Sequence, residues 1–300
     1  MKSALLSQLA PNLRRLLEPI RTWDLIEEIR LRAERPLVVK ERSHEYGVNS
    51  TGICRISESY VVKIEDIART FEIMTDSSRY ALEDEIRAGY LTLCGGHRVG
   101  ISGKAVLESG QIKTFKYING LNLRLARAVI GAADPLMRSI VNRGQVVSTL
   151  IISPPGCGKT TLLRDICRQV SDQGFNTVVI DERSEIAACH RGIPQLDVGR
   201  NSYVIDGCPK AEGISIALRG LAPEVIITDE IGHPDDGSAL ADVIRAGVAV
   251  VASCHGADWD SVSKRFWMQY GWEAFQQAIF LSRRRGPGTV EQVLKLDELA

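Results

Sequence analysis

Two patterns of apolar and polar residues divide the chain near residue 130. In the first part, short segments such as residues 28–33 alternate apolar and charged side chains, and glycine-rich turns separate them. Alternation of this kind is typical of half-buried strands in an antiparallel sheet. In the second part, continuous apolar runs alternate with helical segments, which is typical of a parallel sheet covered on both faces. We therefore expect an α+β domain over residues 1–130 and an α/β domain over residues 131–300.

The first domain is predicted to begin with two short helices, because leucines recur at helical spacing and Pro11 marks a new helix start. We expect these helices either to pack on their own domain or to dock on a partner protein. Residues 28–33 and 37–39 read as a hairpin, and the polar residues 41–59 as a loop or a weak hairpin. Beyond them we expect a short helix over residues 67–74, a helix over residues 77–88, and successive strands over 90–94, 98–101, 105–107, 112–117 and 121–125.

The second domain is predicted to contain buried strands wherever a continuous apolar run occurs, at residues 148–153, 176–181, 224–230 and 248–253. Residues 190–208 contain Pro194 and several glycines, which indicates a surface loop. Two further strands are expected at residues 278–282 and 290–296, and the arginine-rich segment 283–288 between them indicates a solvated turn. The expected helices span residues 135–142, 159–173, 208–219 and 236–246.

The first buried strand of this domain runs into a glycine-rich turn and then a helix, which is the layout of a phosphate-binding loop. Successive N–H groups in such a turn, with the positive end of the following helix, form a concave anion site. We expect Lys159 to reach the β- and γ-phosphates of ATP and the Thr160 hydroxyl to bind Mg²⁺. The common pattern begins with glycine where this chain has Ser153. The predicted nucleotide-binding residues are Pro155, Gly156, Cys157, Gly158, Lys159, Thr160 and Thr161.

A phosphate-binding loop of this type requires an acidic residue at the end of a later hydrophobic strand, and residues 225–230 meet that requirement. We expect Asp229 to hold Mg²⁺ through water beside Thr160. Glu230 is placed to accept a proton from the attacking water as general base. Taken alone, the two acids could instead cap the next helix. Together with the phosphate-binding loop they favour nucleotide hydrolysis.

Polar residues also follow two other buried strands, Asp181-Glu182 after one and His255 after another. The carboxyl ends of parallel strands line the ligand crevice, so we expect these groups to face the γ-phosphate or the water. His255 could sense the γ-phosphate or serve as a structural histidine in its loop. In the first domain, three arginines could reach a nucleotide across a domain or subunit boundary, or could be solvated charges on strands. They are Arg98, Arg124 and Arg127.

The composition narrows the possible partners and compartments. Lys and Arg number 37, as do Asp and Glu, so no basic excess attracts nucleic acid and no nucleic-acid partner is expected. The seven cysteines are scattered and form no Cys-x-x-Cys pair, which favours reduced thiols over a disulfide framework or a structural zinc site. No signal peptide and no apolar run long enough to span a membrane is evident.

The assembled motifs resemble the type II/IV secretion and pilus-motor ATPases. The resemblance lies in residues 217–232, in the acidic segment 180–185, in Ser253-Cys-His-Gly256, and in the arginine-bearing strand 98–101. The chain resembles the stage III sporulation protein AA family more closely and over nearly its full length. That family's motifs occur here as Glu28-Ile-Arg-Leu-Arg-Ala-Glu-Arg-Pro-Leu37, Gly95-Gly-His-Arg-Val-Gly100, Asn119-Gly-Leu-Asn-Leu-Arg-Leu-Ala-Arg127 and Ile205-Asp-Gly-Cys-Pro-Lys-Ala-Glu-Gly213.

The resemblance implies a cytoplasmic hexameric ATPase in the mother cell of an endospore former, held at the membrane by proteins of a channel to the forespore. The chain departs from the secretion-ATPase pattern at Ser153. It also has Asp229 and Gly232-His233 where many secretion ATPases have glycine and an arginine-containing continuation. The function we expect is an ATP-hydrolysing motor with a RecA-like C-terminal domain. The alternatives are a nucleic-acid-dependent motor on the same core and a nucleotide-dependent assembly scaffold with slow turnover.

Overall fold

The computed structural model describes residues 2–42, 44–75, 82–264 and 272–296. The chain divides into two units, Met1–Arg127 and Ala128–Ala300, and the pattern change near residue 130 lies close to this division. Each unit has a seven-stranded sheet of its own. No described helix combines the length and the hydropathy that crossing a bilayer requires.

The sheet of the N-terminal unit is antiparallel, with strand order β5-β4-β3-β1-β9-β8-β7. The predicted hairpin is confirmed, since Ile29 of the first strand lies opposite Val39. The strands are β1 (Ile26–Arg32), β3 (Val38–Glu41), β4 (His44–Asn49), β5 (Gly52–Cys54), β7 (Tyr90–Thr92), β8 (Arg98–Glu108) and β9 (Gln111–Arg124), with the separate pair β2 (Arg35–Pro36) and β6 (Val61–Val62). The helices are α1 (Lys2–Ser7), α2 (Pro11–Leu17), α3 (Ile64–Met74) and α4 (Glu83–Arg87), with short 3₁₀ turns η1 (Trp23–Leu25) and η2 (Ile56–Glu58).

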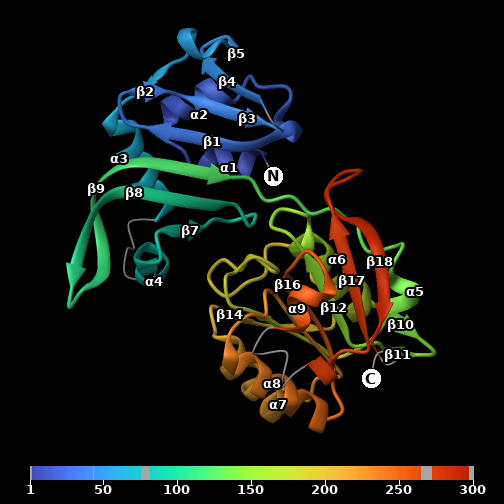
Figure 1. Cartoon of the computed structure of the whole chain (residues 1–300). Helices are drawn as coiled ribbons and strands as arrows, with labels where there is room; N and C mark the ends of the chain where they lie inside the picture. Colours follow the sequence, from blue (N-terminus) through green and yellow to red (C-terminus); the bar gives the residue numbers. More distant parts are fainter. Residues whose placement is uncertain (1, 43, 76–81, 265–271, 297–300) are drawn as a thin grey trace. The chain divides into compact units, whose positions relative to one another are not determined.

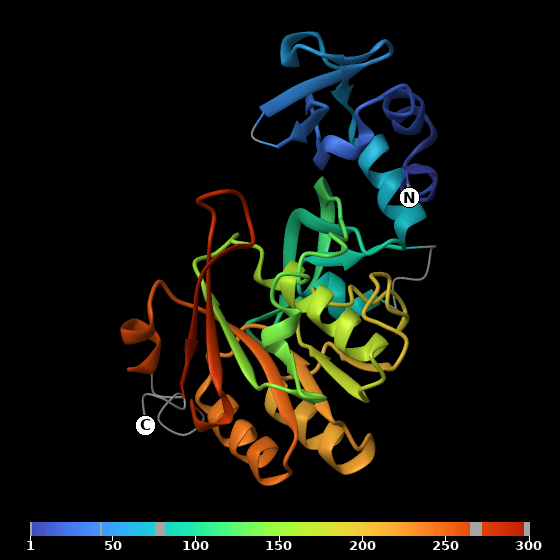
Figure 2. The ribbon, with the colours of Figure 1, turned by 90° about the vertical axis from the view of Figure 1, so that its right-hand side faces the viewer.

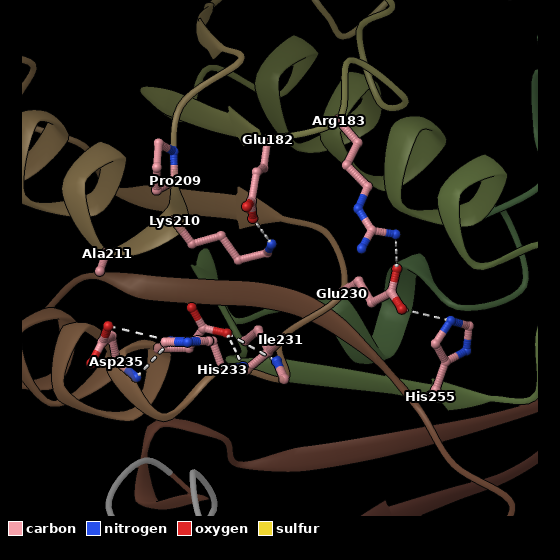
Figure 3. Close-up of a pocket in the computed structure, with 12 residues that line it drawn as sticks. Glu182, Arg183, Pro209, Lys210, Ala211, Glu230, Ile231, His233, Asp235 and His255 are labelled. Carbon is pink, nitrogen blue, oxygen red and sulfur yellow. Dashed lines mark hydrogen bonds and ion pairs between the residues drawn. The ribbon is translucent and has the colours of Figure 1, made fainter. Parts of the chain in front are cut away.

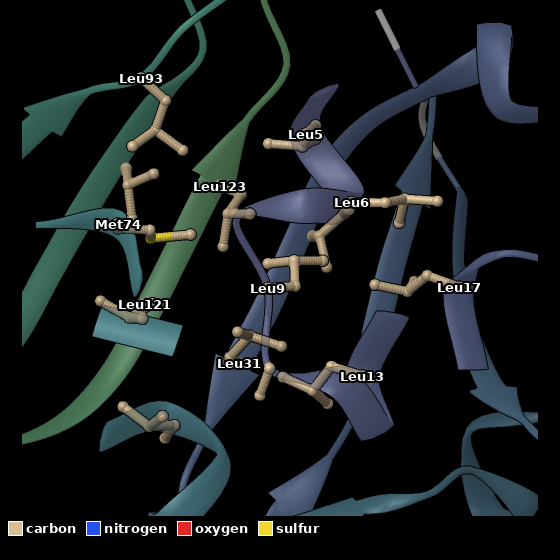
Figure 4. Packing of buried hydrophobic residues seen from close by; sticks show 14 of the residues in the cluster. Leu5, Leu6, Leu9, Leu13, Leu17, Leu31, Met74, Leu93, Leu121 and Leu123 are labelled. Carbon is tan, nitrogen blue, oxygen red and sulfur yellow. The ribbon is translucent and has the colours of Figure 1, made fainter. Parts of the chain in front are cut away.

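Leucines of the first two helices and of the turn between them belong to this unit's core. Leu5 of α1, Leu9 of the turn and Leu13 of α2 are fully buried. They pack in one cluster with Leu31 of β1 and Leu121 of β9, as Figure 4 shows. Burying a leucine side chain contributes about 1.5–3 kcal/mol. The helices therefore pack on their own unit, as the first of the two interpretations had it.

One prediction for this unit is confirmed in one of its two forms, and another is wrong. Of the loop and the weak hairpin expected over residues 41–59, the hairpin is present, because β4 and β5 pair with each other in antiparallel fashion. The separate strands expected between residues 98 and 125 are one long hairpin of β8 and β9, visible in Figure 1. The glycines had indicated turns, but Gly103 lies inside β8 at a register shift, where a Cβ would meet the Lys116 carbonyl oxygen at 2.9 Å. It marks a close approach of two strands.

The helix expected over residues 77–88 falls partly on residues 76–81, outside the described residues, and its described part is α4.

The C-terminal unit contains the predicted α/β architecture with a mostly parallel sheet. The strand order is β14-β13-β15-β16-β12-β17-β18, and every neighbouring pair is parallel except β17 with β18. The strands are β12 (Thr149–Ser153), β13 (Thr177–Asp181), β14 (Ser202–Asp206), β15 (Val225–Thr228), β16 (Ala249–His255), β17 (Gln277–Ser282) and β18 (Thr289–Lys295), with a small pair β10 (Val141–Asn142) and β11 (Gln145–Val146). The helices are α5 (Met137–Ile140), α6 (Lys159–Asp172), α7 (Lys210–Gly220), α8 (Pro234–Arg245) and α9 (Trp259–Ser263), with the 3₁₀ turn η4 (Trp272–Ala274).

Alternate residues of the parallel strands face two helical layers. Leu150 and Ile152 of β12 belong to the cluster that contains residues of α7 and α8. Ile151, which points to the other face, packs with residues of α6. Figures 1 and 2 show α7 and α8 side by side on their face of the sheet. Burial on both faces explains why these strands read as continuous apolar runs.

Three boundaries in this unit differ from the prediction. Residues 190–208 are not all loop, because they include β14 at the sheet edge. With a neighbour on one side only and no fully buried residue, β14 lacks the apolar run that marks the central strands. The helix expected over residues 135–142 is the single turn α5, which leads into β10. The helix expected from residue 208 begins at Lys210, after Pro209.

Candidate functional site

Strand order places three polar strand ends side by side in the C-terminal unit. Strand β16 lies between β12, which leads into the glycine-rich turn, and β15, which leads to Asp229 and Glu230. The register pairs Ser153 at the end of β12 with His255 at the end of β16. Two strand spacings separate β12 from β15, which is about 10 Å. A histidine at the intervening strand end therefore has the position and the length to link the two.

The turn between β12 and α6 has the backbone geometry of an anion cradle. Gly156 and Gly158 have φ values of 70° and 89°, which L side chains rarely adopt. The first hydrogen bond of α6 runs from the Leu162 N–H to the Gly158 carbonyl, at 3.0 Å. The N–H groups of the residues before Leu162 therefore have no acceptor within the helix. These N–H groups and the positive helix end together fit a phosphate group.

Lys159 folds back over this turn. Its Nζ donates to the carbonyl oxygens of Ser153 at 3.1 Å and Pro154 at 3.4 Å, and to the Ser153 hydroxyl at 3.3 Å. It also lies 2.9 Å from His255 Nδ1. Burial lowers the pKa of the Lys159 ammonium, although the nearby Glu230 carboxylate opposes that effect. Ser153, which replaces the usual first glycine, thus supplies two of the oxygens that hold this lysine, and a glycine would lack the hydroxyl.

His255 joins the lysine to the predicted general base. Its Nε2 lies 2.7 Å from Glu230 Oε1, and its Nδ1 faces Lys159. A lysine ammonium has only donors, so Nδ1 accepts and Nε2 carries the proton that is donated to the carboxylate. The other carboxylate oxygen of Glu230 accepts from Arg183 Nη1 at 2.9 Å. Figure 3 shows Glu230 between Arg183 and His255.

Asp229 is buried beside a lysine that the sequence had not singled out. The residue is 4% exposed, and its Oδ1 lies 3.6 Å from Lys210 Nζ without a hydrogen-bond partner among the described residues. Lys210 donates to Glu182 instead. Burial raises the pKa of Asp229 to about 6, with Lys210 opposing the rise. A buried, orphaned carboxylate oxygen fits a cation bound directly or through water.

A cavity of about 500 Å³ opens beside these groups. Glu230 and His255 line it on one side, and Lys210 and Glu182 on another, as the close-up in Figure 3 shows. The general-base candidate therefore faces open space large enough for water and for the end of a substrate.

The structure assigns Asp181 a different place from the one expected. Its carboxylate does not face the crevice but accepts the backbone N–H groups of Glu185, Ile186 and Ala187 at 2.8, 3.0 and 2.8 Å. Asp181 is fully buried, so it orders the loop after β13. Its neighbour Glu182 does reach the cavity.

The three predicted arginines all lie in the N-terminal unit. Arg98 and Arg124 are opposite each other in the β8–β9 pairing, and the Arg98 guanidinium lies 3.8 Å from the centre of the Tyr90 ring. Arg127 donates to the Ile26 carbonyl. Their contact with a nucleotide stays a prediction.

Sequence reasoning missed Arg183 and Lys210. Arg183 follows Glu182 directly, and its approach to Glu230 depends on β13 and β15 being neighbours, which the sequence does not specify. Lys210 offered a signal, since it lies inside the motif 205–213 that carried the family resemblance. Its place as the first residue of α7 directs it toward Asp229.

Two solved structures share the fold of this chain. The solved structure of the ATPase DotB of Legionella pneumophila superposes with a TM-score of 0.55 at 15% identity, covering 85% of this chain and 72% of DotB. The pilus retraction motor PilT with bound ADP gives 0.56 at 15% identity, covering 86% and 74%. At such identities the likeness shows a shared fold.

Sequence comparison is more specific. "Stage III sporulation protein AA" of Bacillus subtilis (strain 168) is 41% identical over 286 residues, which cover 93% of this chain and 90% of that protein. The family model described as "Sporulation stage III, protein AA" matches residues 1–297. This chain belongs to the sporulation stage III protein AA family.

Proposed function

We propose that this chain hydrolyses ATP and uses the energy as a motor in a secretion-like complex of sporulation. The observation that carries the proposal is the link Lys159–His255–Glu230, at 2.9 and 2.7 Å. It joins the residue expected to bind the phosphates to the residue expected to activate water. Both belong to a fold shared with DotB, an ATPase, and with PilT, a pilus retraction motor.

In the proposed mechanism, the N–H groups of residues 156–160 and Lys159 bind the phosphates of ATP. Lys159 exchanges its contacts with the Ser153 and Pro154 carbonyls for phosphate oxygens, which are stronger partners for an ammonium. Glu230 accepts the proton of a water that attacks the γ-phosphorus in line. Lys159 neutralises part of the charge that develops in the transition state.

The donor set also fits Mg²⁺, with the Thr160 hydroxyl and Asp229 as the residues that would hold it, the latter through water. Thr160 follows Lys159 at the start of α6, and the Oδ1 of Asp229 is orphaned. The metal would neutralise phosphate charge. We further propose that an arginine among Arg98, Arg124 and Arg127 completes the site from the N-terminal unit or a neighbouring subunit.

On this proposal the working form is a homo-hexamer, cytoplasmic and peripheral to a membrane through partner proteins of a sporulation channel. Family membership and the secretion-ATPase fold support it. A nucleotide-dependent scaffold with slow turnover is the competing possibility, since Lys159 and Glu230 are both engaged by protein groups in this state.

The test uses the full chain and two variants. Lys159→Ala is expected to lose ATP binding, whereas Glu230→Gln is expected to bind ATP and retain it unhydrolysed, with turnover reduced about 100-fold or more. Turnover per chain measured against protein concentration, with native mass, separates the motor from the scaffold. An arginine supplied by a neighbour makes the specific activity rise with assembly. An assembled Glu230→Gln protein that turns over ATP at the wild-type rate would refute the assignment.

A further inference from the structure

The turn between β17 and β18 rests on the phosphate-binding loop. The Gly288 N–H donates to the Cys157 carbonyl at 2.7 Å. A Cβ on Gly158 would lie 3.1 Å from the Gly288 nitrogen, which is a tight approach. The two glycine-containing turns are therefore in direct contact, although more than a hundred residues separate them in the sequence.

Arg283 begins this turn and extends its guanidinium over the loop. Its Nη1 lies 3.6 Å from the place where a Cβ on Gly156 would be. Gly156 is exposed and has a left-handed backbone, so the guanidinium lies close to an exposed glycine of the phosphate-binding loop.

Arg283 and its neighbour Arg284 differ in whether a carboxylate pairs with them. Arg284 pairs with Glu291 of β18 at 3.0 Å. The Arg283 side chain forms no hydrogen bond or ion pair with the residues that the structure describes, and it is exposed. An arginine placed beside free N–H groups, a helix N-terminus and Lys159, with no carboxylate partner, concentrates positive charge that an anion would neutralise.

We propose that Arg283 binds a phosphate group of the nucleotide held by its own phosphate-binding loop. This inference rests on the proposed nucleotide binding and assigns a residue to it. Guanidinium is suited to the task, because it is always charged and presents paired N–H donors to phosphate oxygens. The turn expected from the sequence to be solvated is, on this view, part of the binding site, supplied by the same chain.

The test is equilibrium binding of ADP to the full chain, measured by calorimetry with and without Mg²⁺. Arg283→Ala is expected to raise the Kd for ADP about tenfold or more, as loss of a charge-assisted hydrogen bond requires. Arg283→Lys, which keeps the positive charge but lacks the paired N–H donors of a guanidinium, should give an intermediate Kd. Arg285→Ala is the matched control, since Arg285 is an exposed residue of the same turn and its removal changes the net charge equally. It should bind ADP as the wild type does.

The outcomes separate the two proposals. If the wild type binds ADP and Arg283→Ala binds it as tightly as Arg285→Ala does, the role of Arg283 is refuted while nucleotide binding stands. If both substitutions weaken binding equally, the effect is general electrostatics and the specific contact is refuted. If the wild type binds no nucleotide, both proposals fail. Unchanged thermal unfolding of Arg283→Ala excludes a folding defect as the cause of weaker binding.

Discussion

Substituting Asp229 by asparagine should make the protein more stable at neutral pH while it removes the proposed metal contact. The carboxylate is buried, and its Oδ1 has no hydrogen-bond partner among the described residues. Burial disfavours its ionised form and raises its pKa from the usual 3.8 to about 6. At pH values where Asp229 is ionised, burial of its charge therefore lowers the free energy of unfolding. The asparagine variant has no charge at this position and does not lose this stability.

The sign and the size of the effect follow from the two pKa values. Well below pH 3.8 the carboxyl is protonated in the folded and unfolded chains, and burial costs nothing through ionisation. As the pH rises from 3.8 towards about 6 the unfolded chain releases its proton first, so the stability of the wild type falls. Above that range the full difference applies, which at 1.36 kcal/mol per pH unit is about 3 kcal/mol.

The assay is urea unfolding of the full chain, following the transition that belongs to the C-terminal unit, between about pH 4 and about pH 7. The stability advantage of Asp229→Asn over the wild type should grow by about 2 kcal/mol across this range. Asp260→Asn is the control, because Asp260 is exposed, and its difference from the wild type should not follow that course. Binding of ATP with Mg²⁺ should be weakened by Asp229→Asn. An advantage that does not increase with pH would refute the reasoning.

Two further substitutions test the contacts that hold the loops around the site in place. Gly158→Ala should destabilise the C-terminal unit by at least about 1 kcal/mol more than the control Gly174→Ala in thermal unfolding. Both glycines have a positive φ, but only at Gly158 would a Cβ meet another chain segment, at Gly288. Equal losses of stability would mean that this contact is unimportant. Asp181→Ala removes the carboxylate that accepts from the two buried N–H groups of Ile186 and Ala187 and from the partly buried N–H of Glu185, and should cost about 3 kcal/mol or more in urea unfolding. The control Asp197→Ala removes a single exposed acceptor and should cost under about 1 kcal/mol, so a comparable loss would contradict a structural role for Asp181.

The sequence predicted those features of the site that depend on local order. The continuous apolar runs identified the central strands, and the glycine-rich turn with Lys159 identified the anion cradle, because the chemistry of a phosphate-binding loop is local to a few residues. Asp229 and Glu230 were singled out because the expected mechanism needs acids at a strand end, and the structure places both directly after β15. Their roles stay predictions. Edge strand β14 was missed, since a strand with one neighbour does not need a buried run.

What the sequence could not supply was the order of the strands across the sheet. That order places β16 between β12 and β15, and so decides that His255 contacts Lys159 and Glu230. It also makes β13 a neighbour of β15, which brings Arg183 to Glu230. Interactions between residues on different strands depend on this global arrangement, and no pattern along the chain encodes it directly.

On the proposed function, the partners that the site residues have in this structure define which contacts nucleotide binding would change. Lys159 is held by loop oxygens and His255, Glu230 by Arg183 and His255, and Asp229 lies beside Lys210. Lys159 and Glu230 are thus each held by protein partners where substrate groups would lie, whereas Asp229 Oδ1 has only the nearby charge of Lys210. When Lys159 turns to a phosphate, His255 Nδ1 loses its donor, and the hydrogen bond that His255 makes to Glu230 is free to change with it. On the proposed function, His255 would couple phosphate binding on β12 to the base candidate on β15, a role that neither a purely structural histidine nor an isolated phosphate sensor would have.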